Sequence, residues 1–580
     1  MKKILAGKYA FLMAVVFAVT IGTGAGFGAL LFKKLIFYVQ YLAFDLLGGI
    51  LENTFGSWGF IFVPAIGGLL VGLVIYYGAR EAKGHGVPEV MDAMANKGGR
   101  IRPKIVVVKT LASALCIGSG GSVGREGPIV QIGSALGSTV GQILKLPTPW
   151  IRTLVACGAA AGISATFNTP LAGALFAYEL LMPSFAMIGF SSIVISAVIG
   201  NVVAIHFLGR DSVFNMSGIA AMSDSRELVI YVLLGLTVAL IGFLFVKAIN
   251  FSEDLFESIK KIPEWLMPVF GGLIVGVLAL YSKDLMGVGY GDVPWKAMAS
   301  LDQAIDGTIP LKILFFMVFL KIIANATTIG SGGSGGVFAP SLFIGGMVGG
   351  IFGYIAQFFF PDVHIGTYAI VGGGAFFAAV GRAPITSILM ILELTRNYSL
   401  VVPVMITVVL ANEMFRFINK ETIYTEKLIR RGTDILGMGT ARLATGVKVE
   451  DIMLEIESTI LPSTPIEDLP GIFKSTDHMG LLVVNEKDEL VGIVTHTDYD
   501  RYKASGENLS IVDEICTKKL KKAYPDQTVN EIMNWGINSD IARIPVVSIE
   551  DDTKLIGIIR RESFLRAWKM AYTKGERSIL

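Results

Sequence analysis

An internal duplication of a glycine-rich motif constrains this sequence more than any other feature. Gly118–Pro128 aligns with Gly330–Pro340, with seven of eleven positions identical at an offset of 212 residues. Other pairs keep the same order at nearly the same offset: Pro64 with Pro268, Gly67–Gly72 with Gly271–Gly276, Gly84–Gly86 with Gly289–Gly291, Pro170 with Pro384, and Glu179 with Glu393. The sequence therefore predicts two structural repeats, at about 10–208 and 225–425.

The repeats lie in a strongly apolar region. Hydrophobic residues make up 53% of the 580 and charged residues 17%, against about 25% charged in an average soluble domain. Apolar stretches continue almost unbroken to about Leu410, and several are short or broken by glycine and proline. Duplicated segments of this kind are typical of transporters and related channels with discontinuous helices. A membrane domain is expected over residues 1–430.

The two ends of the chain bear on orientation and partners. The apolar run Tyr9–Phe32 is interpreted as a first membrane helix and not as a signal peptide, because it is long and more spans follow. Lys2, Lys3 and Lys8 place its start in the cytoplasm by the positive-inside rule. The net charge of +2 gives no reason to expect nucleic acid as a partner.

After Tyr424 the composition changes to a charged region with short apolar runs. Candidate strands are Leu481–Val484, Leu490–Val494, Ile544–Val547 and Leu555–Ile559. This region is itself duplicated, since Val449–Met453 matches Val512–Cys516. We expect a linker at 431–445 and two α/β domains at 446–505 and 506–575.

The glycine motifs have the chemistry of an anion site. Helix N-termini attract anions through free N–H groups and the helix dipole, without a full charge that would prevent release. Glycines expose the backbone, and Pro128 and Pro340 suit a first helical turn. Glu126 lies inside Gly118–Pro128. A carboxylate at this position competes with an anion when it is ionised and leaves the site when it is protonated. The alternative is a carboxylate paired with adjacent Arg125 at a helix start.

Together these residues resemble the CLC family of chloride channels and chloride/proton antiporters. Gly124–Pro128 is similar to the family's GREGP motif, Gly336–Pro340 to GxFxP, and Gly84–Pro88 to GSGIP, while Tyr424 lies where the family has its central tyrosine. The tail resembles a tandem pair of CBS domains. The resemblance implies an all-α inverted-repeat membrane fold of about eighteen helices, several of them discontinuous, followed by the α/β tail. It also implies a homodimer in the plasma (inner) membrane with both termini cytoplasmic.

By the same resemblance, chloride is the transported ligand and no cofactor is required. The amides of Val337 and Phe338 and the hydroxyl of Tyr424 would hold a central chloride. The amides around Arg125, Gly127 and Ala339 would form an outer site with Glu126 as the gate, and the first motif would line the pathway with His85, Gly86 and Val87.

Two positions depart from the family pattern. His85 replaces the usual serine; it would donate an N–H to an anion and titrate near neutral pH, or else merely cap a helix. Leu180 occupies the position where antiporters carry an internal proton-transferring glutamate, and leucine cannot transfer protons. Glu179 beside it is interpreted as structural. The sequence therefore favours a voltage- or pH-gated channel slightly, with a chloride/proton antiporter that has an unusual proton route as the alternative.

The remaining predictions concern the tail and other protein classes. Thr495 and Asp498 fit a ribose-binding signature, so one site for ATP, ADP or AMP is expected there, the alternative being a module without ligand. A magnesium-type cation transporter with CBS domains would need clustered oxygen ligands. An intramembrane hydrolase is disfavoured because no H-E-x-x-H occurs and the G-x-S-x-G match at Gly120–Gly124 lacks its strand-turn-helix context. No metal site is expected.

Overall fold

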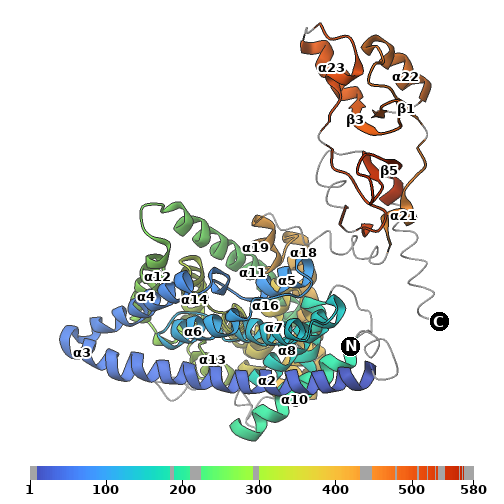
Figure 1. Cartoon of the computed structure of the whole chain (residues 1–580). Helices are drawn as coiled ribbons and strands as arrows, with labels where there is room; N and C mark the ends of the chain where they lie inside the picture. The colour runs from blue at the N-terminus through green and yellow to red at the C-terminus, as the bar shows by residue number, and fades with distance from the viewer. Residues whose placement is uncertain are drawn as a thin grey trace. The chain divides into compact units, whose positions relative to one another are not determined.

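The computed structural model of the chain describes residues 10–182, 189–209, 222, 224–291, 299–431, 447–456, 458–476, 480–505, 508–518, 520–529, 531–532, 543–560, 562–564 and 566. It divides into two compact units, Met1–Ile435 and Leu436–Leu580, which are treated separately (Figure 1). The linker expected at 431–445 lies outside the described residues apart from Arg431.

Among its described residues, the regular elements of the first unit are helices. Its first half contains α2 (Ala10–Gln40), α3 (Gly49–Phe55), α4 (Phe62–Tyr77), α5 (Val87–Asn96), α6 (Lys104–Gly118), α7 (Glu126–Ile143), α8 (Thr148–Phe167), α9 (Pro170–Phe176) and α10 (Phe190–Leu208). Its second half contains α11 (Glu227–Ser258), α12 (Met267–Ala279), α13 (Ser300–Ile305), α14 (Leu311–Gly330), α15 (Phe338–Phe359), α16 (Ile365–Gly381), α17 (Pro384–Thr395), α18 (Val401–Ile418) and α19 (Thr425–Arg430).

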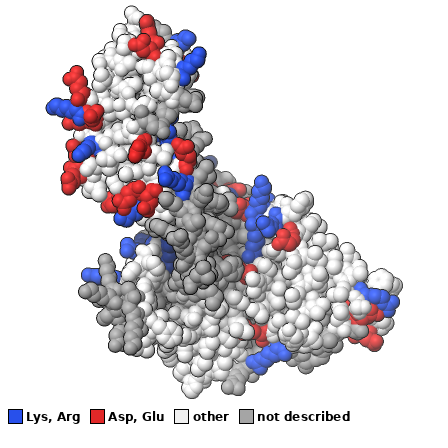
Figure 2. Space-filling model, turned by 90° about the vertical axis from the view of Figure 1, so that its right-hand side faces the viewer, with Lys and Arg blue, Asp and Glu red and all other residues white. Residues whose placement is uncertain are grey.

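Helix length separates full spans from half-spans. Eight helices in the described part of the chain are long and apolar enough to cross a membrane. Others are apolar but short: α17 has 12 residues, which at about 1.5 Å per residue is about 18 Å against a hydrocarbon core of about 30 Å. The prediction of an all-α membrane domain with discontinuous helices is confirmed. Large uncharged areas cover the visible face of this unit (Figure 2).

The two repeats contact each other reciprocally where α4 crosses α12. A Cβ on Gly68 would lie 2.2 Å from the carbonyl oxygen of Pro268, and a Cβ on Gly272 would lie 2.2 Å from that of Pro64. Because these residues are repeat equivalents, equal reciprocal distances indicate a two-fold axis between the repeats. The glycines let the backbones touch, as close packing of membrane helices requires.

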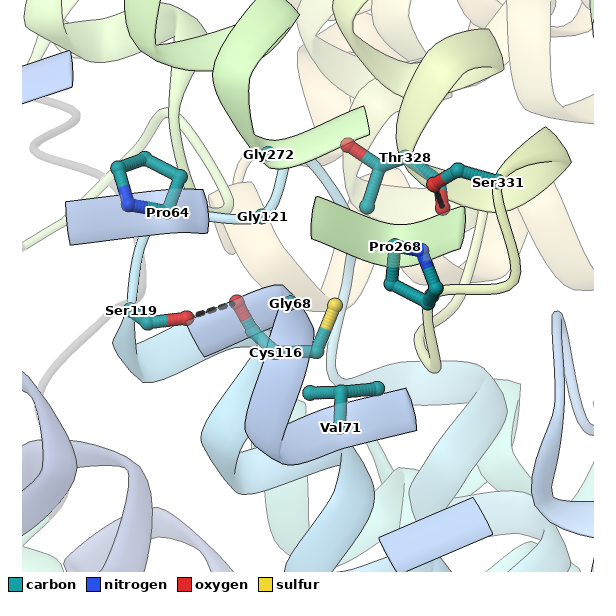
Figure 3. A pocket seen from close by; sticks show the side chains of 11 residues that line it. Pro64, Gly68, Val71, Cys116, Ser119, Gly121, Pro268, Gly272, Thr328 and Ser331 are labelled. Atoms are coloured by element: carbon teal, nitrogen blue, oxygen red, sulfur yellow. Dashed lines mark hydrogen bonds between the residues drawn. The ribbon is translucent and has the colours of Figure 1, made fainter. Parts of the chain in front are cut away.

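A small cavity of about 20 Å³ lies on this axis (Figure 3). Its lining consists mainly of repeat-related pairs: Pro64 and Pro268, Gly68 and Gly272, Cys116 and Thr328, Ser119 and Ser331, and Gly121 and Gly333. The Ser119 and Ser331 hydroxyls donate to backbone carbonyls of the preceding turn, at 2.7 Å to Leu115 and 3.1 Å to Thr328. This cavity therefore has room for about one water molecule.

The second unit is a small α/β structure in two halves. Its strands are β1 (Thr459–Ile460), β2 (Gly480–Val484), β3 (Leu490–Thr495), β4 (Arg543–Val547) and β5 (Leu555–Arg560), and its helices include α21 (Val449–Ile452), α22 (Leu469–Thr476), α23 (His496–Ser505) and α24 (Val512–Ile515). β1 is parallel to β2, and the pairs β2–β3 and β4–β5 are antiparallel. The four strands expected from sequence are therefore confirmed.

Each half of this unit completes the sheet of the other. Leu454, near the start of the first half, exchanges two backbone hydrogen bonds with Ile558 of β5, at 2.9 and 3.1 Å. Thr517, near the start of the second half, exchanges two with Ile493 of β3, at 2.8 and 3.1 Å. Leu482, Ile493, Val547 and Ile558 pack together in one buried cluster. The two halves therefore form one continuous structure and not two independently folded domains.

Candidate functional site

The two duplicated motifs meet at the starts of α7 and α15. Glu126 is the first residue of α7 and Phe338 the first of α15, and the two are repeat equivalents. Just before them, Gly124 and Gly336 exchange a pair of backbone hydrogen bonds of 2.7 and 2.6 Å. The helix N-termini that the sequence predicts as anion sites are thus joined to each other directly.

The first motif adds a third helix start to this junction. Gly84 donates to the Gly333 carbonyl at 2.9 Å and accepts from the Gly335 amide at 3.3 Å. Gly86 then turns the chain into α5 with φ of 85°. Gly127 packs so tightly that a Cβ there would lie 2.0 Å from the His85 carbonyl oxygen. Three N-termini from distant parts of the chain therefore converge.

The convergence leaves amides available for a ligand. Within the described part of the chain, the amides of Gly127, Val337 and Phe338 donate no backbone hydrogen bond. First-turn amides have no partner inside their own helix. An anion placed at the junction would accept from them and would also meet the positive ends of the helix dipoles.

Glu126 is buried at the centre of the junction, with 2% of its surface exposed. Its Oε1 accepts a hydrogen bond of 2.9 Å from the Tyr290 hydroxyl. Its Oε2 lies against the Gly124 backbone near the Ala339 amide and has no hydrogen-bond partner of ordinary geometry among the described residues. Tyr290 belongs to Gly289–Gly291, the repeat counterpart of Gly84–Gly86, so the duplication was the signal that could have singled it out.

Aromatic side chains enclose the other side of the junction. The Phe338 ring is 3% exposed and lies between Phe377 and Phe167, with centroids 4.4 and 5.1 Å away. Tyr424, immediately before α19, is 2% exposed and close enough to Glu126 to interact with it electrostatically. The structure thus brings Glu126, Phe338 and Tyr424 into one buried region.

His85 is buried with both ring nitrogens unpaired among the described residues. The charges that act on it are those of Lys427, Lys109 and Arg431. Neither ring nitrogen bonds to the backbone among the described residues, so His85 does not form the helix cap considered from sequence. Lys427 forms an ion pair of 2.8 Å with Glu253, which fixes α19 against α11.

Two repeat-related buried lysines hold the loops that carry His85 and Tyr290. Lys109 donates to the carbonyls of Ala82 and Gly84, at 2.9 and 2.7 Å. Lys321 donates to those of Asp284, Leu285 and Gly287, at 3.2, 3.1 and 3.0 Å. Both lysines are fully buried, and they are 212 residues apart, the offset of the glycine motifs. They were not among the residues predicted from sequence.

Glu179 of the first repeat caps a helix of the second repeat, and Glu393 of the second repeat caps a helix of the first. The two Glu179 oxygens accept from the amides of Ile385 and Thr386 at the start of α17, at 3.2 and 2.8 Å. The two Glu393 oxygens accept from Leu171 and Ala172 at the start of α9, at 2.9 and 2.8 Å. This agrees with the structural role favoured for Glu179. Leu180 beside it is half-buried in the apolar core and offers no proton carrier.

In the tail, Thr495 and Asp498 form a closed turn at the end of β3. Asp498 Oδ2 accepts from the Thr495 amide at 2.9 Å and from its hydroxyl at 2.7 Å. In the second half the equivalent turn is weaker, since the Arg560 amide donates to the Ser563 hydroxyl at 3.2 Å. The two halves thus share a turn geometry, and the first carries the carboxylate.

Buried helix N-termini that meet on a two-fold axis inside an apolar helical unit define an anion-transport membrane protein of the inverted-repeat class. Comparison with known proteins identifies the family. The profile described as "Voltage gated chloride channel" matches residues 67–416, and the CBS domain profile matches 449–504 and 512–569. The chain belongs to this family, the CLC family of channels and transporters, whose members are not enzymes, and its tail contains two CBS domains.

Individual relatives agree with this assignment. The chain is 32% identical over 429 residues to the H(+)/Cl(-) exchange transporter ClcA of Vibrio parahaemolyticus, an alignment that covers 72% of this chain and 89% of the relative. Its fold is similar to a slow cyanobacterial Cl-/H+ antiporter (TM-score 0.65, 24% identity, covering 72% and 97% of the two chains). It is also similar to a eukaryotic CLC transporter (TM-score 0.61, 21% identity, covering 96% and 98%).

Proposed function

We propose that this protein exchanges chloride for protons across the membrane, with Glu126 as the gate. The observation that carries the proposal is the buried Glu126 carboxylate at the joined N-termini of α7 and α15, surrounded by amides without backbone partners. Unprotonated, the carboxylate occupies the position that suits an anion; protonated, it loses the charge that holds it there. One residue thereby links anion passage to a proton.

Exchange is preferred here to the passive channel that the sequence slightly favours. Relatives that are 32% identical to this chain are named as H(+)/Cl(-) exchange transporters, which supports the antiporter alternative. Leu180 still removes the usual internal proton carrier, so protons would reach Glu126 from that side through water or His85. The channel reading rests on Leu180 alone.

Anion binding is proposed at two levels along the pathway. The amides of Val337 and Phe338 with the Tyr424 hydroxyl form the central site, and the amides around Arg125, Gly127 and Ala339 form the outer one. His85, Gly86 and Val87 line the inner entrance, where the unpaired imidazole donates to the ion. By the family resemblance, the protein is a homodimer in the plasma (inner) membrane with cytoplasmic termini.

Reconstitution into liposomes with simultaneous chloride and pH electrodes tests exchange. An outward chloride gradient is expected to drive protons inward against their own gradient, and protein-free liposomes provide the baseline. Chloride efflux without any proton movement would instead support a channel. Absence of chloride flux would contradict the transport proposal itself.

The CBS unit is proposed to bind one adenine nucleotide at Thr495 and Asp498. The turn is already formed by hydrogen bonds to Asp498 Oδ2, which places the carboxylate at the end of β3. Titration calorimetry of the full chain with ATP, ADP and AMP is expected to show binding with one site per chain, and Asp498→Ala is expected to abolish it. Ser563→Ala, at the equivalent turn of the second half, is the control expected to leave binding unchanged. No heat at millimolar nucleotide would support a module without ligand.

A further inference from the structure

Tyr290 lies in the repeat counterpart of Gly84–Gly86 and belongs to neither of the proposed anion sites. It lies in the loop Gly289–Gly291, far from Glu126 in sequence, and only 2% of its surface is exposed. Its hydroxyl donates to Glu126 Oε1 at 2.9 Å. The guanidinium of Arg125 lies 6.0 Å from the centroid of its ring. The phenol therefore contacts the gate carboxylate and the cation beside it.

The loop that carries Tyr290 is held from several sides. Lys321 fixes the preceding turn through three carbonyls, the last of them that of Gly287. Gly289 has φ of 84°, and a Cβ there would lie 2.5 Å from the ring of Phe343. The Gly291 amide donates to Asp302 Oδ2 at 2.8 Å. Because the backbone is fixed on both sides by contacts that do not involve Glu126, the position of the phenol does not depend on that side chain.

A cavity of about 500 Å³ lies next to this contact. Arg125, Lys33 and Tyr290 are among its lining residues, and Glu126 is not. Tyr290 thus borders the cavity on one side and bonds to the buried carboxylate on the other. A Glu126 side chain that moved toward the cavity would have to break the bond to Tyr290.

We infer that Tyr290 is a latch on the gate: a positioning residue whose hydroxyl holds the ionised Glu126 carboxylate in its buried, blocking position. The inference rests on the proposed function of Glu126. A phenol donor favours the ionised carboxylate and contributes less to the protonated one. The latch therefore sets how readily protons open the pathway.

The test compares Tyr290→Phe with the wild-type protein in chloride-efflux assays over a range of pH. Losing a hydrogen bond to a charged group is expected to raise chloride turnover about tenfold at neutral pH and to move half-maximal efflux up by about one pH unit. Among the described residues, the other charged or titratable groups near the pair include Arg125, Tyr424, Asp302 and Lys33, all unchanged in the variant. In a Glu126→Ala background, the same Tyr290→Phe change is expected to have no effect.

A second tyrosine–glutamate pair provides the matched control. Tyr368 is buried and donates to Glu227 Oε2 at 3.2 Å, away from the joined N-termini of α7 and α15. Tyr368→Phe should leave the pH profile unchanged. If Tyr290→Phe has the wild-type profile, or keeps its effect without the Glu126 carboxylate, the latch is wrong while the gate stands. If Glu126→Ala itself leaves efflux and its pH dependence unchanged, the proposed function fails first.

Discussion

Glu126→Ala is expected to keep chloride moving while proton transport falls to the level of protein-free liposomes. Alanine removes the Glu126 carboxylate from the junction of α7 and α15, and with it the group proposed to take up a proton and to compete with the anion. Chloride efflux should become independent of pH and at least as fast as in the wild-type protein. The electrodes that test exchange measure both quantities in one experiment.

Glu227→Gln controls for the loss of any buried carboxylate. Glu227 is 1% exposed and also accepts from a tyrosine, but it lies at the start of α11 and away from the converging N-termini. It should transport like the wild-type protein. Chloride-driven proton pumping that survives in Glu126→Ala would exclude Glu126 as the coupling residue.

Gly127→Ala is expected to lower chloride flux by about tenfold in protein that still purifies in folded form. The new Cβ would lie 2.0 Å from the His85 carbonyl oxygen and 3.0 Å from the Gly336 Cα, so only backbone movement relieves the clash. Overpacking of this kind costs about 1–3 kcal/mol, and every 1.4 kcal/mol is tenfold. The displacement separates the three converging motifs and with them the amides proposed to hold chloride.

Gly49→Ala is the matched substitution for this prediction. Gly49 has helical φ and ψ of −61° and −41°, and a Cβ there meets nothing within 4 Å. Its flux and its chloride affinity by calorimetry should equal those of the wild-type protein. Wild-type flux in Gly127→Ala would show that the close approach of the first and second motifs is not needed for conduction.

The sequence allowed the main elements of this site to be predicted because they leave a local pattern. Glycines followed by proline identify helix starts, and their duplication identifies the repeats that bring those starts together. Tyr290 was missed because a tyrosine between glycines has no chemical signature until its partner is known. The alignment of Tyr290 with His85 indicates that the two residues occupy equivalent positions in the two repeats. It does not indicate that the loop carrying Tyr290 contacts Glu126.

Other parts of the site depend on three-dimensional contacts that no local pattern contains. A lysine within an apolar helix, such as Lys109 or Lys321, gives no indication of which carbonyls it will bond. Glu179 was correctly interpreted as structural, yet its target, the start of α17 in the other repeat, follows only from the two-fold axis. The choice between channel and exchanger was harder still, because Leu180 reports a missing proton carrier and not what replaces it.

The reciprocal capping by Glu179 and Glu393, each of a helix in the other repeat, has a consequence for biogenesis. The amides of Leu171 and Ala172 wait for a carboxylate 222 and 221 residues further along the chain, so the ribosome has yet to synthesise their partner when α9 emerges. Until then α9 has two uncapped donors that hydrocarbon cannot satisfy. The first repeat is therefore incomplete until Glu393 has been synthesised, and we expect α9 to reach its final position only after that residue emerges.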